Sequence, residues 1–143
     1  MIGVILTGHG SFASGLYSSL KLIAGKQKNI IAVDFASNDS TDDLRNKLNM
    51  AIEELSECDN ILVLTDLIGG SPFKESILIK VQSSKRIEVL SGTNLGMLLE
   101  TCMTKTFENN MDNLIDIAIN SGKKQIVKYE LKTQEEEEIT DGI

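Results

Sequence analysis

The sequence has 143 residues and a formal net charge of −7, with 41% hydrophobic and 24% charged residues, a composition typical of one globular domain. The acidic balance argues against a nucleic-acid surface, which needs a basic stripe, so we expect no nucleic acid among the partners. No apolar run approaches the ~18 residues of a membrane-spanning helix, and the chain starts in a strand pattern without a signal sequence, so we expect a cytoplasmic protein.

The first predicted strand leads directly to the only histidine of the chain. Residues 2–6 are apolar or Gly and rich in β-branched types, which is typical of a strand buried on both faces. The strand stops at Gly8-His9-Gly10, where two glycines allow a sharp bend and leave the imidazole uncrowded. In an open α/β sheet such a loop lies at the carboxyl ends of the strands, where ligands usually bind. A lone histidine is more often structural than chemical, so the rest of the sequence must decide its role.

Helices and strands then alternate as far as residue 65. The histidine is followed by a predicted helix that ends at Gly25. Its apolar stripe consists of Phe12, Leu16, Leu20 and Ile23. A second strand is predicted over residues 29–35, and Ser40 with Asp43 resembles a capping box that opens the next helix. The apolar stripe of that helix consists of Leu44, Leu48, Ala51, Ile52 and Leu55. Residues 61–65 form a third buried strand.

The third strand ends at a second loop with functional potential, residues 66–72. Ser71 is the natural N-cap and Pro72 suits the first turn of a helix whose predicted apolar stripe is Phe73, Ile77 and Val81. A fourth strand is predicted over residues 86–90. Two further helices have apolar stripes formed by Leu95, Leu98, Leu99 and Cys102 and by Met111, Leu114, Ile115, Ala118 and Ile119, and Gly122 marks the end of the second.

The C-terminal part differs from the rest. Toward the end of residues 125–131 apolar and charged side chains alternate, which predicts a half-exposed strand at a sheet edge or between subunits. The following polar, acidic stretch has too little apolar surface to order itself. We therefore predict a domain over residues 1–131 and a disordered acidic tail over residues 132–143. The alternation of elements predicts an α/β fold: a doubly wound, mainly parallel sheet with helices on both faces, in the common order 2-1-3-4-5.

In this strand order the first and third strands are neighbours, so His9 and Asp66 can meet across the crevice between them. A carboxylate that accepts the imidazole Nδ1–H would fix the tautomer and leave the Nε2 lone pair pointing outward. It would also stabilise the positive charge that develops when the ring attacks an electrophile. The pair is therefore our candidate catalytic centre.

Two groups of anion donors flank this pair. Backbone N–H groups at the start of helices bind anions, and the candidate phosphate-binding residues are Gly10, Ser11, Gly69, Gly70 and Ser71. A nucleophilic imidazole with an orienting carboxylate and such donors can accept a phosphoryl group and pass it on. Neither a Walker motif nor GxGxxG is present, and one histidine falls short of a metal ligand set, so we expect no metal and no cofactor. Cys58 and Cys102 have no CxxC spacing and are expected to be free thiols.

In order and spacing these motifs resemble the IIA components of the mannose/fructose/sorbose family of the bacterial phosphoenolpyruvate-dependent sugar phosphotransferase system. The first strand of that family ends in a His-Gly pair, matched by His9 and Gly10. Its third strand ends in Asp-x-x-Gly-Gly-Ser-Pro-Phe, matched by residues 66–73. A later Gly-x-Asn-x-x-Met-Leu segment is matched by residues 92–98, and the resemblance extends from Met1 to about Leu131.

The resemblance implies a function for these residues. His9 would receive a phosphoryl group from the histidine phosphocarrier protein HPr and pass it to a IIB component, with Asp66 as its partner and Ser71 with neighbouring amides on the phosphoryl group. The membrane IIC and IID components would be involved only indirectly. We expect IIB to be a separate protein, because an acidic tail ends this chain. Leu67 and Ile68 replace a polar and an aromatic residue of some relatives, so the resemblance does not extend to the partner contacts near the site.

The resemblance also implies an assembly. Family members form homodimers in which a C-terminal antiparallel strand crosses to the other subunit, and residues 127–131 agree with that role.

Two other classes of function stay open. A signalling receiver domain has the same sheet order and would be phosphorylated on Asp66. Its chemistry needs an acidic pair after the first strand to hold Mg²⁺, and Thr7-Gly8-His9 stands there instead. A non-catalytic, flavodoxin-like binding module would use His9 only as a polar contact, so that His9→Ala would change affinity and abolish no covalent chemistry.

Overall fold

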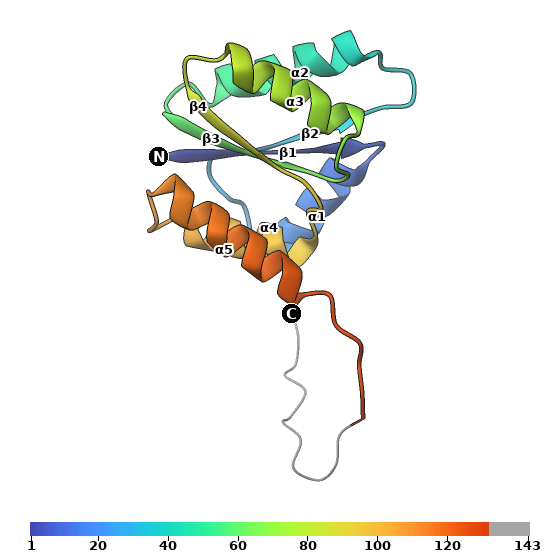
Figure 1. Cartoon of the computed structure of the whole chain (residues 1–143), viewed down its shortest axis with the longest axis vertical. Coiled ribbons are helices and arrows are strands. Elements are labelled where there is room, and N and C mark those ends of the chain that lie inside the picture. The colour runs from blue at the N-terminus through green and yellow to red at the C-terminus, as the bar shows by residue number, and fades with distance from the viewer. Residues whose placement is uncertain (132–143) are drawn as a thin grey trace.

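The computed structural model describes residues 1–131 as a parallel sheet between two layers of helices (Figure 1). Within these residues the strands lie in the order β2-β1-β3-β4. They are β1 (Ile2–His9), β2 (Ile30–Phe35), β3 (Asn60–Thr65) and β4 (Arg86–Leu90). The helices are α1 (Phe12–Ala24), α2 (Thr41–Glu54), α3 (Ser71–Gln82), α4 (Leu95–Thr104) and α5 (Met111–Lys124). The predicted α/β class and the order of the first four strands are confirmed.

The central strand β1 separates two apolar cores. Helices α2 and α3 cover one face of the sheet, and α1, α4 and α5 cover the other (Figure 1). Val4 and Leu6 pack into the core beneath α1, α4 and α5, whereas Ile5 packs into the core beneath α2 and α3. This alternation explains why the strand is a continuous apolar run rather than an alternating one. Cys58 and Cys102 are free, as predicted, and both are buried.

β1 is longer than predicted and ends at the histidine itself. Gly8 and His9 continue the parallel ladder, opposite Asp34 and Phe35 of β2. His9 is therefore the last residue of a strand and not the tip of a loop, which gives its backbone the fixed position of a sheet residue. Helix ends are closer to expectation: the Ser40–Asp43 capping box is present with both of its hydrogen bonds, and Gly25 follows α1 with a φ of 74°.

Two predictions about α3 are wrong. Gly70, not Ser71, is the N-cap, and Ser71 is the first residue of the helix. The predicted stripe of Phe73, Ile77 and Val81 is not the buried side; Val81 is 77% exposed. The buried side of α3 consists of Pro72, Glu75, Ser76 and Ile79.

The reason for the second error is that two polar residues on α3 are buried with their partners. Glu75 accepts a hydrogen bond from Arg45 Nε of α2 at 2.8 Å, and the Ser76 hydroxyl donates to the Pro72 carbonyl at 2.6 Å. Burial therefore does not follow apolar spacing on this helix, and apolar side chains are left on its outer side.

The predicted strand at the C-terminus is not formed within this single chain. Residues 126–131 have no regular structure, and the side chains of Ile126, Val127, Tyr129 and Leu131 are exposed. A strand needs a neighbour to satisfy its backbone groups, and Figure 1 shows this segment leaving α5 and running away from the sheet. The predicted fifth position of the sheet is therefore empty in residues 1–131. The acidic tail predicted over residues 132–143 lies outside the described residues.

The end of α5 also differs from the prediction. Gly122 lies inside the last turn of the helix and is buried, and α5 continues to Lys124. A Cβ atom at Gly122 would lie 3.2 Å from Met97 Sδ, so the glycine permits the close approach of α4 and α5. None of the helices in the described part of the chain is long and apolar enough to cross a membrane.

Candidate functional site

His9 and Asp66 lie together at the carboxyl ends of neighbouring strands. β1 and β3 pair with Thr7 opposite Thr65, so the residues that follow emerge at the same edge of the sheet. His9 Nδ1 lies 2.8 Å from Asp66 Oδ2, and the His9 backbone N–H donates to the same oxygen at 2.9 Å. The structure thus brings together the two side chains that the strand order predicted would meet. Their chemical roles stay predictions.

The surroundings of Asp66 favour its charged form. Its side chain is 14% exposed, and burial alone would raise its pKa. The hydrogen bonds from the His9 backbone, the His9 ring and the Leu67 backbone outweigh burial and hold the pKa of Asp66 below its ordinary value. A carboxylate only accepts hydrogen bonds, so the imidazole proton belongs on Nδ1 and the lone pair on Nε2. The His9 side chain is 46% exposed, which leaves it accessible to another protein.

Two further residues restrict the position of the His9 imidazole ring. The Phe35 ring packs edge-to-face on it, with ring centroids 5.9 Å apart and planes at 60°. The Gly70 backbone comes so close that a Cβ atom there would lie 2.7 Å from His9 Cε1. Sequence reasoning missed Phe35, although β2 is the neighbour of β1 and its last residue stands opposite His9. The close approach of Gly70 leaves no sequence signal beyond the glycine itself.

The predicted anion donors do not all offer a vacant N–H group. The Gly10 amide donates to the Phe35 carbonyl at 2.8 Å, and the Gly70 amide donates to the Leu67 carbonyl at 3.2 Å. Ser71 stands at the first position of α3, where an N–H has no acceptor within the helix. The amides of Ser11 and Gly69 have no acceptor among the described residues. The vacant donors are therefore Ser11, Gly69 and Ser71, while Gly10 and Gly70 shape the two loops.

Both loops are bent by glycines in the left-handed region, and the loop after β3 carries exposed apolar residues. Gly10 has a φ of 58° and Gly69 a φ of 76°, values that side chains with a Cβ atom rarely adopt. Leu67 and Ile68, between Asp66 and Gly69, are exposed. Among residues 1–131 no group of three His, Cys, Asp or Glu side chains could hold a metal ion.

Known proteins are similar to this chain in sequence and fold. A family model described as the PTS system fructose IIA component (EIIA-man) matches residues 3–119. The chain is 34% identical over 100 residues to the PTS system fructose-specific EIIA component of Bacillus subtilis (strain 168), which covers 70% of this chain and 68% of that protein. It is 29% identical over 134 residues to the PTS system mannose-specific EIIAB component of Escherichia coli (strain K12), covering 94% of this chain. The chain spans only 41% of the length of that relative.

Solved structures give the same result. The crystal structure of phosphotransferase system component EIIA from Streptococcus agalactiae is 40% identical, with a TM-score of 0.83 over 90% of this chain and 97% of that one. The mannose/sorbose specific IIA subunit from Enterococcus faecalis is 25% identical, with a TM-score of 0.82 over 91% of this chain and 96% of that one. Since the family model also covers most of the sequence, the chain belongs to the EIIA components of the mannose/fructose/sorbose family of the phosphotransferase system.

Proposed function

We propose that this chain is a phosphocarrier of a bacterial sugar phosphotransferase system, which accepts a phosphoryl group on His9 from phospho-HPr and passes it to a IIB component during sugar uptake. It would act as a phosphotransferase component through a phosphohistidine intermediate. The observation that carries the proposal is the half-exposed imidazole whose Nδ1 is held 2.8 Å from a carboxylate. Family membership supports the same reading.

This geometry supports both of the proposed transfers. The lone pair of His9 Nε2 attacks the phosphorus atom of phospho-HPr, and the pair of the breaking P–N bond returns to the histidine of HPr. The positive charge that develops on the His9 ring is stabilised by Asp66 through the Nδ1–H bond. In the second transfer a nucleophile of IIB attacks the phosphorus, and Nε2 recovers its lone pair. Positioning and charge stabilisation supply most of the catalysis in such reactions.

Asp66 itself is a poor candidate for the phosphorylated residue. Oδ2 accepts two hydrogen bonds from His9, and Oδ1 accepts one from the Leu67 amide at 2.8 Å. Attack by either oxygen would break bonds that hold the site together. The geometry therefore favours His9 over the receiver-like alternative.

The vacant amides of Ser11, Gly69 and Ser71 are proposed to hold the phosphoryl oxygens. Helix α3 begins at Ser71, so the positive end of its dipole points toward the site and favours an anion. Gly10 and Gly70 would contribute by shaping the loops. No cofactor takes part in the proposed reaction.

The proposed setting is the cytoplasm, where HPr and IIB would dock over His9 and the membrane IIC and IID components would be reached only through IIB. Leu67 and Ile68 are exposed beside Asp66 and would contact those partners. We also propose that the chain forms a homodimer in which residues 127–131 supply the antiparallel fifth strand. The exposed apolar side chains of this segment support the assignment.

Labelling with phosphoenolpyruvate, enzyme I and HPr tests the proposal. The wild-type chain should acquire an acid-labile, hydroxylamine-resistant phosphate. His9→Ala should acquire none while it keeps its circular dichroism spectrum, because a half-exposed side chain contributes little packing. A hydroxylamine-sensitive label on Asp66 would favour the receiver class, and an unlabelled wild type would favour a binding module.

A further inference from the structure

The loop that follows β4 contains a sequence motif to which the proposed phosphoryl transfer assigns no role. Residues 91–94 join β4 to α4 and include Gly92 and Asn94, the first two fixed positions of the Gly-x-Asn-x-x-Met-Leu segment. We call residues 91–94 the β4 loop. β4 pairs in parallel with β3, so this loop and Asp66 emerge at the same edge of the sheet. In the described residues no hydrogen bond joins the loop to the His9 side chain, so any effect on the imidazole must pass through Asp66.

The backbone of the β4 loop holds the residues that end β3 and follow it. The Gly92 amide donates to the Asp66 carbonyl at 3.2 Å, and the Thr93 amide donates to the Thr65 carbonyl at 3.1 Å. Both bonds lie just past the paired parts of the two strands. The backbone of Asp66 is therefore fixed by the β4 loop, while its carboxylate is joined to His9.

Gly92 has a backbone conformation that suits glycine alone. Its φ is 75°, in the left-handed region, and a Cβ atom built on it would meet no atom within 4 Å. A side chain at this position would therefore cause backbone strain without any clash. The turn that directs the Gly92 amide toward Asp66 thus depends on the conformational freedom of glycine.

The Asn94 side chain joins the other end of the β4 loop to two helices. Its Oδ1 accepts from the Met97 amide at 3.0 Å and caps α4. Its Nδ2 donates to the Gly122 carbonyl of α5 at 2.9 Å. That carbonyl lies in the last turn of α5, where carbonyls lack partners within the helix, and it also accepts from the Gln125 amide at 3.2 Å. One side chain thus fixes the loop against the start of α4 and the end of α5.

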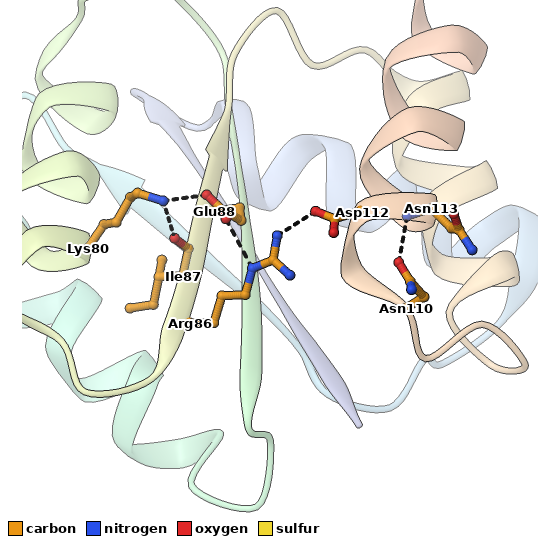
Figure 2. Close-up of polar contacts among 7 residues, drawn as sticks. All are labelled: Lys80, Arg86, Ile87, Glu88, Asn110, Asp112 and Asn113. Carbon is orange, nitrogen blue, oxygen red and sulfur yellow. Dashed lines mark hydrogen bonds and ion pairs between the residues drawn. The ribbon is translucent and has the colours of Figure 1, made fainter.

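Helix α5 is joined to β4 and its following loop near both of the helix ends. In its first turn, Asp112 lies 2.6 Å from a terminal nitrogen of Arg86, the first residue of β4 (Figure 2). Arg86 also pairs with Glu88, which in turn pairs with Lys80 of α3 on the other face of the sheet (Figure 2). In its last turn, the bond from Asn94 makes the second connection. That second connection lies at the edge of the sheet where His9 stands.

We propose that Asn94 and Gly92 are positioning residues for phosphoryl transfer: they fix the β4 loop so that its amides hold the Asp66 backbone, and Asp66 keeps the His9 ring in its Nδ1–H tautomer. The hydrogen bonds form a continuous path from α5 through the loop to the imidazole. Neither residue takes part in bond making. The inference rests on the proposed phosphocarrier function and deepens it, but the tautomer can be measured without any transfer.

Asn94→Ser separates the two roles of this side chain. Serine caps helices about as well as asparagine, so α4 keeps its cap. The serine hydroxyl is one bond from Cβ and the asparagine amide nitrogen is two, so the bond to Gly122 is lost. Asn110→Ser is the matched control: Asn110 also caps a helix, accepting from the Asn113 amide at 3.0 Å, and its Nδ2 donates to no carbonyl of the described residues (Figure 2).

Gly92→Ala tests the next step of the path. Alanine at a φ of 75° strains the loop that carries the amide bonded to Asp66. Gly25→Ala is the matched control, because Gly25 has a φ of 74° and equally open space around its Cβ position. Gly25 follows the last residue of α1, about 20 Å along the helix axis from the end beside His9. The two substitutions should lower the midpoint of thermal unfolding by the same amount.

Two measurements are made on every variant and on the wild type. His9 is the only histidine, so one set of nitrogen–proton NMR signals reports the tautomer of its ring. At a pH where the ring is neutral, the wild type should be mainly the Nδ1–H form, and Asn94→Ser and Gly92→Ala should show a larger share of the Nε2–H form. Single-turnover transfer from phospho-HPr should be about tenfold slower in both, the rate equivalent of one hydrogen bond. Both controls should match the wild type in tautomer and rate.

The other outcomes overturn the inference in different ways. A wild-type tautomer ratio in Asn94→Ser and Gly92→Ala would refute the positioning role, whatever their transfer rates, because the loop would then act on docking and not on Asp66. Equal changes in the variants and their controls would reduce the effect to general destabilisation. Either variant is sufficient for the test if the other does not fold.

The same samples separate this inference from the phosphocarrier function. A wild type that takes the label on His9, with variants that keep its tautomer ratio, refutes only the positioning role. A tautomer ratio that shifts as expected in a chain that takes no label refutes only the phosphocarrier function.

Discussion

Substitution of Gly70 by Ala tests whether the position of the imidazole controls phosphoryl transfer. The backbone of Gly70 has a φ of −72°, which alanine adopts without strain, so the change acts through its Cβ atom alone. That atom would lie 2.7 Å from His9 Cε1, roughly 1 Å short of an ordinary carbon–carbon contact. The ring must move by about this amount and lose its 2.8 Å contact with Asp66. A misplacement of about 1 Å can cost on the order of 10² in rate.

The assay is single-turnover transfer from radiolabelled phospho-HPr in a quench-flow instrument, with thermal unfolding measured alongside. We expect the transfer rate of Gly70→Ala to fall on the order of 10²-fold while the unfolding transition stays cooperative. Gly15→Ala is the matched control: Gly15 lies inside α1, and no atom would contact its new Cβ. It should leave the rate unchanged and raise the unfolding free energy by up to ~1 kcal/mol. A wild-type rate in Gly70→Ala would refute the claim that Gly70 positions the ring.

Three further predictions concern Asp66 and the N-cap of α2. Asp66→Asn should slow transfer by on the order of 10²–10⁴ without weakening HPr binding, because it removes the charge opposite the imidazolium; an unaltered single-turnover rate would contradict this. The folded-state pKa of Asp66 lies below the value of 3.8 for an unperturbed aspartate, so its ionisation stabilises the fold above pH 3.8 and that contribution is lost as the pH falls through the folded value. Urea titrations at a series of pH values should therefore show the wild type losing its stability advantage over Asp66→Asn in acid. Ser40→Ala removes the hydroxyl that accepts from the Asp43 amide at 3.0 Å, and it should lower the unfolding free energy by about 1 kcal/mol without changing His9 labelling.

The fold and the central pair of the site were predictable because their signals are local or topological. Strands buried on both faces are continuous apolar runs, and the helices between them are amphipathic. The order of strands and helices can therefore be predicted from the periodicity of the apolar residues. Once the strand order is assumed, residues that end the first and third strands must emerge at one edge. His9 and Asp66 needed no other information to be placed together. The capping box at Ser40 was equally predictable from the sequence, because both of its hydrogen bonds join residues that are three positions apart.

The features that sequence reasoning missed depend on tertiary contacts. The Gly70 backbone approaches His9 from the loop after β3, and spacing along the chain does not predict that distance. The buried side of α3 was assigned wrongly because Glu75 and Ser76 are polar. Each is buried only because a partner satisfies it: Arg45 of α2 for Glu75, and the carbonyl of Pro72 for Ser76.

The proposed homodimer would give the two wrong assignments, on α3 and at the C-terminus, a common physical explanation. Phe73, Ile77 and Val81 form an apolar stripe that the single chain does not bury, and residues 127–131 form a strand pattern with no strand beside it. In the proposed homodimer, residues 127–131 of a second copy would form the fifth strand beside β4, and the apolar stripe of α3 is the other surface that the single chain leaves uncovered. Apolar periodicity predicts that a residue is buried, but it does not identify which chain buries it. When two predicted buried segments are both left uncovered in one chain, the pair of failures is therefore evidence for an interface with a second chain.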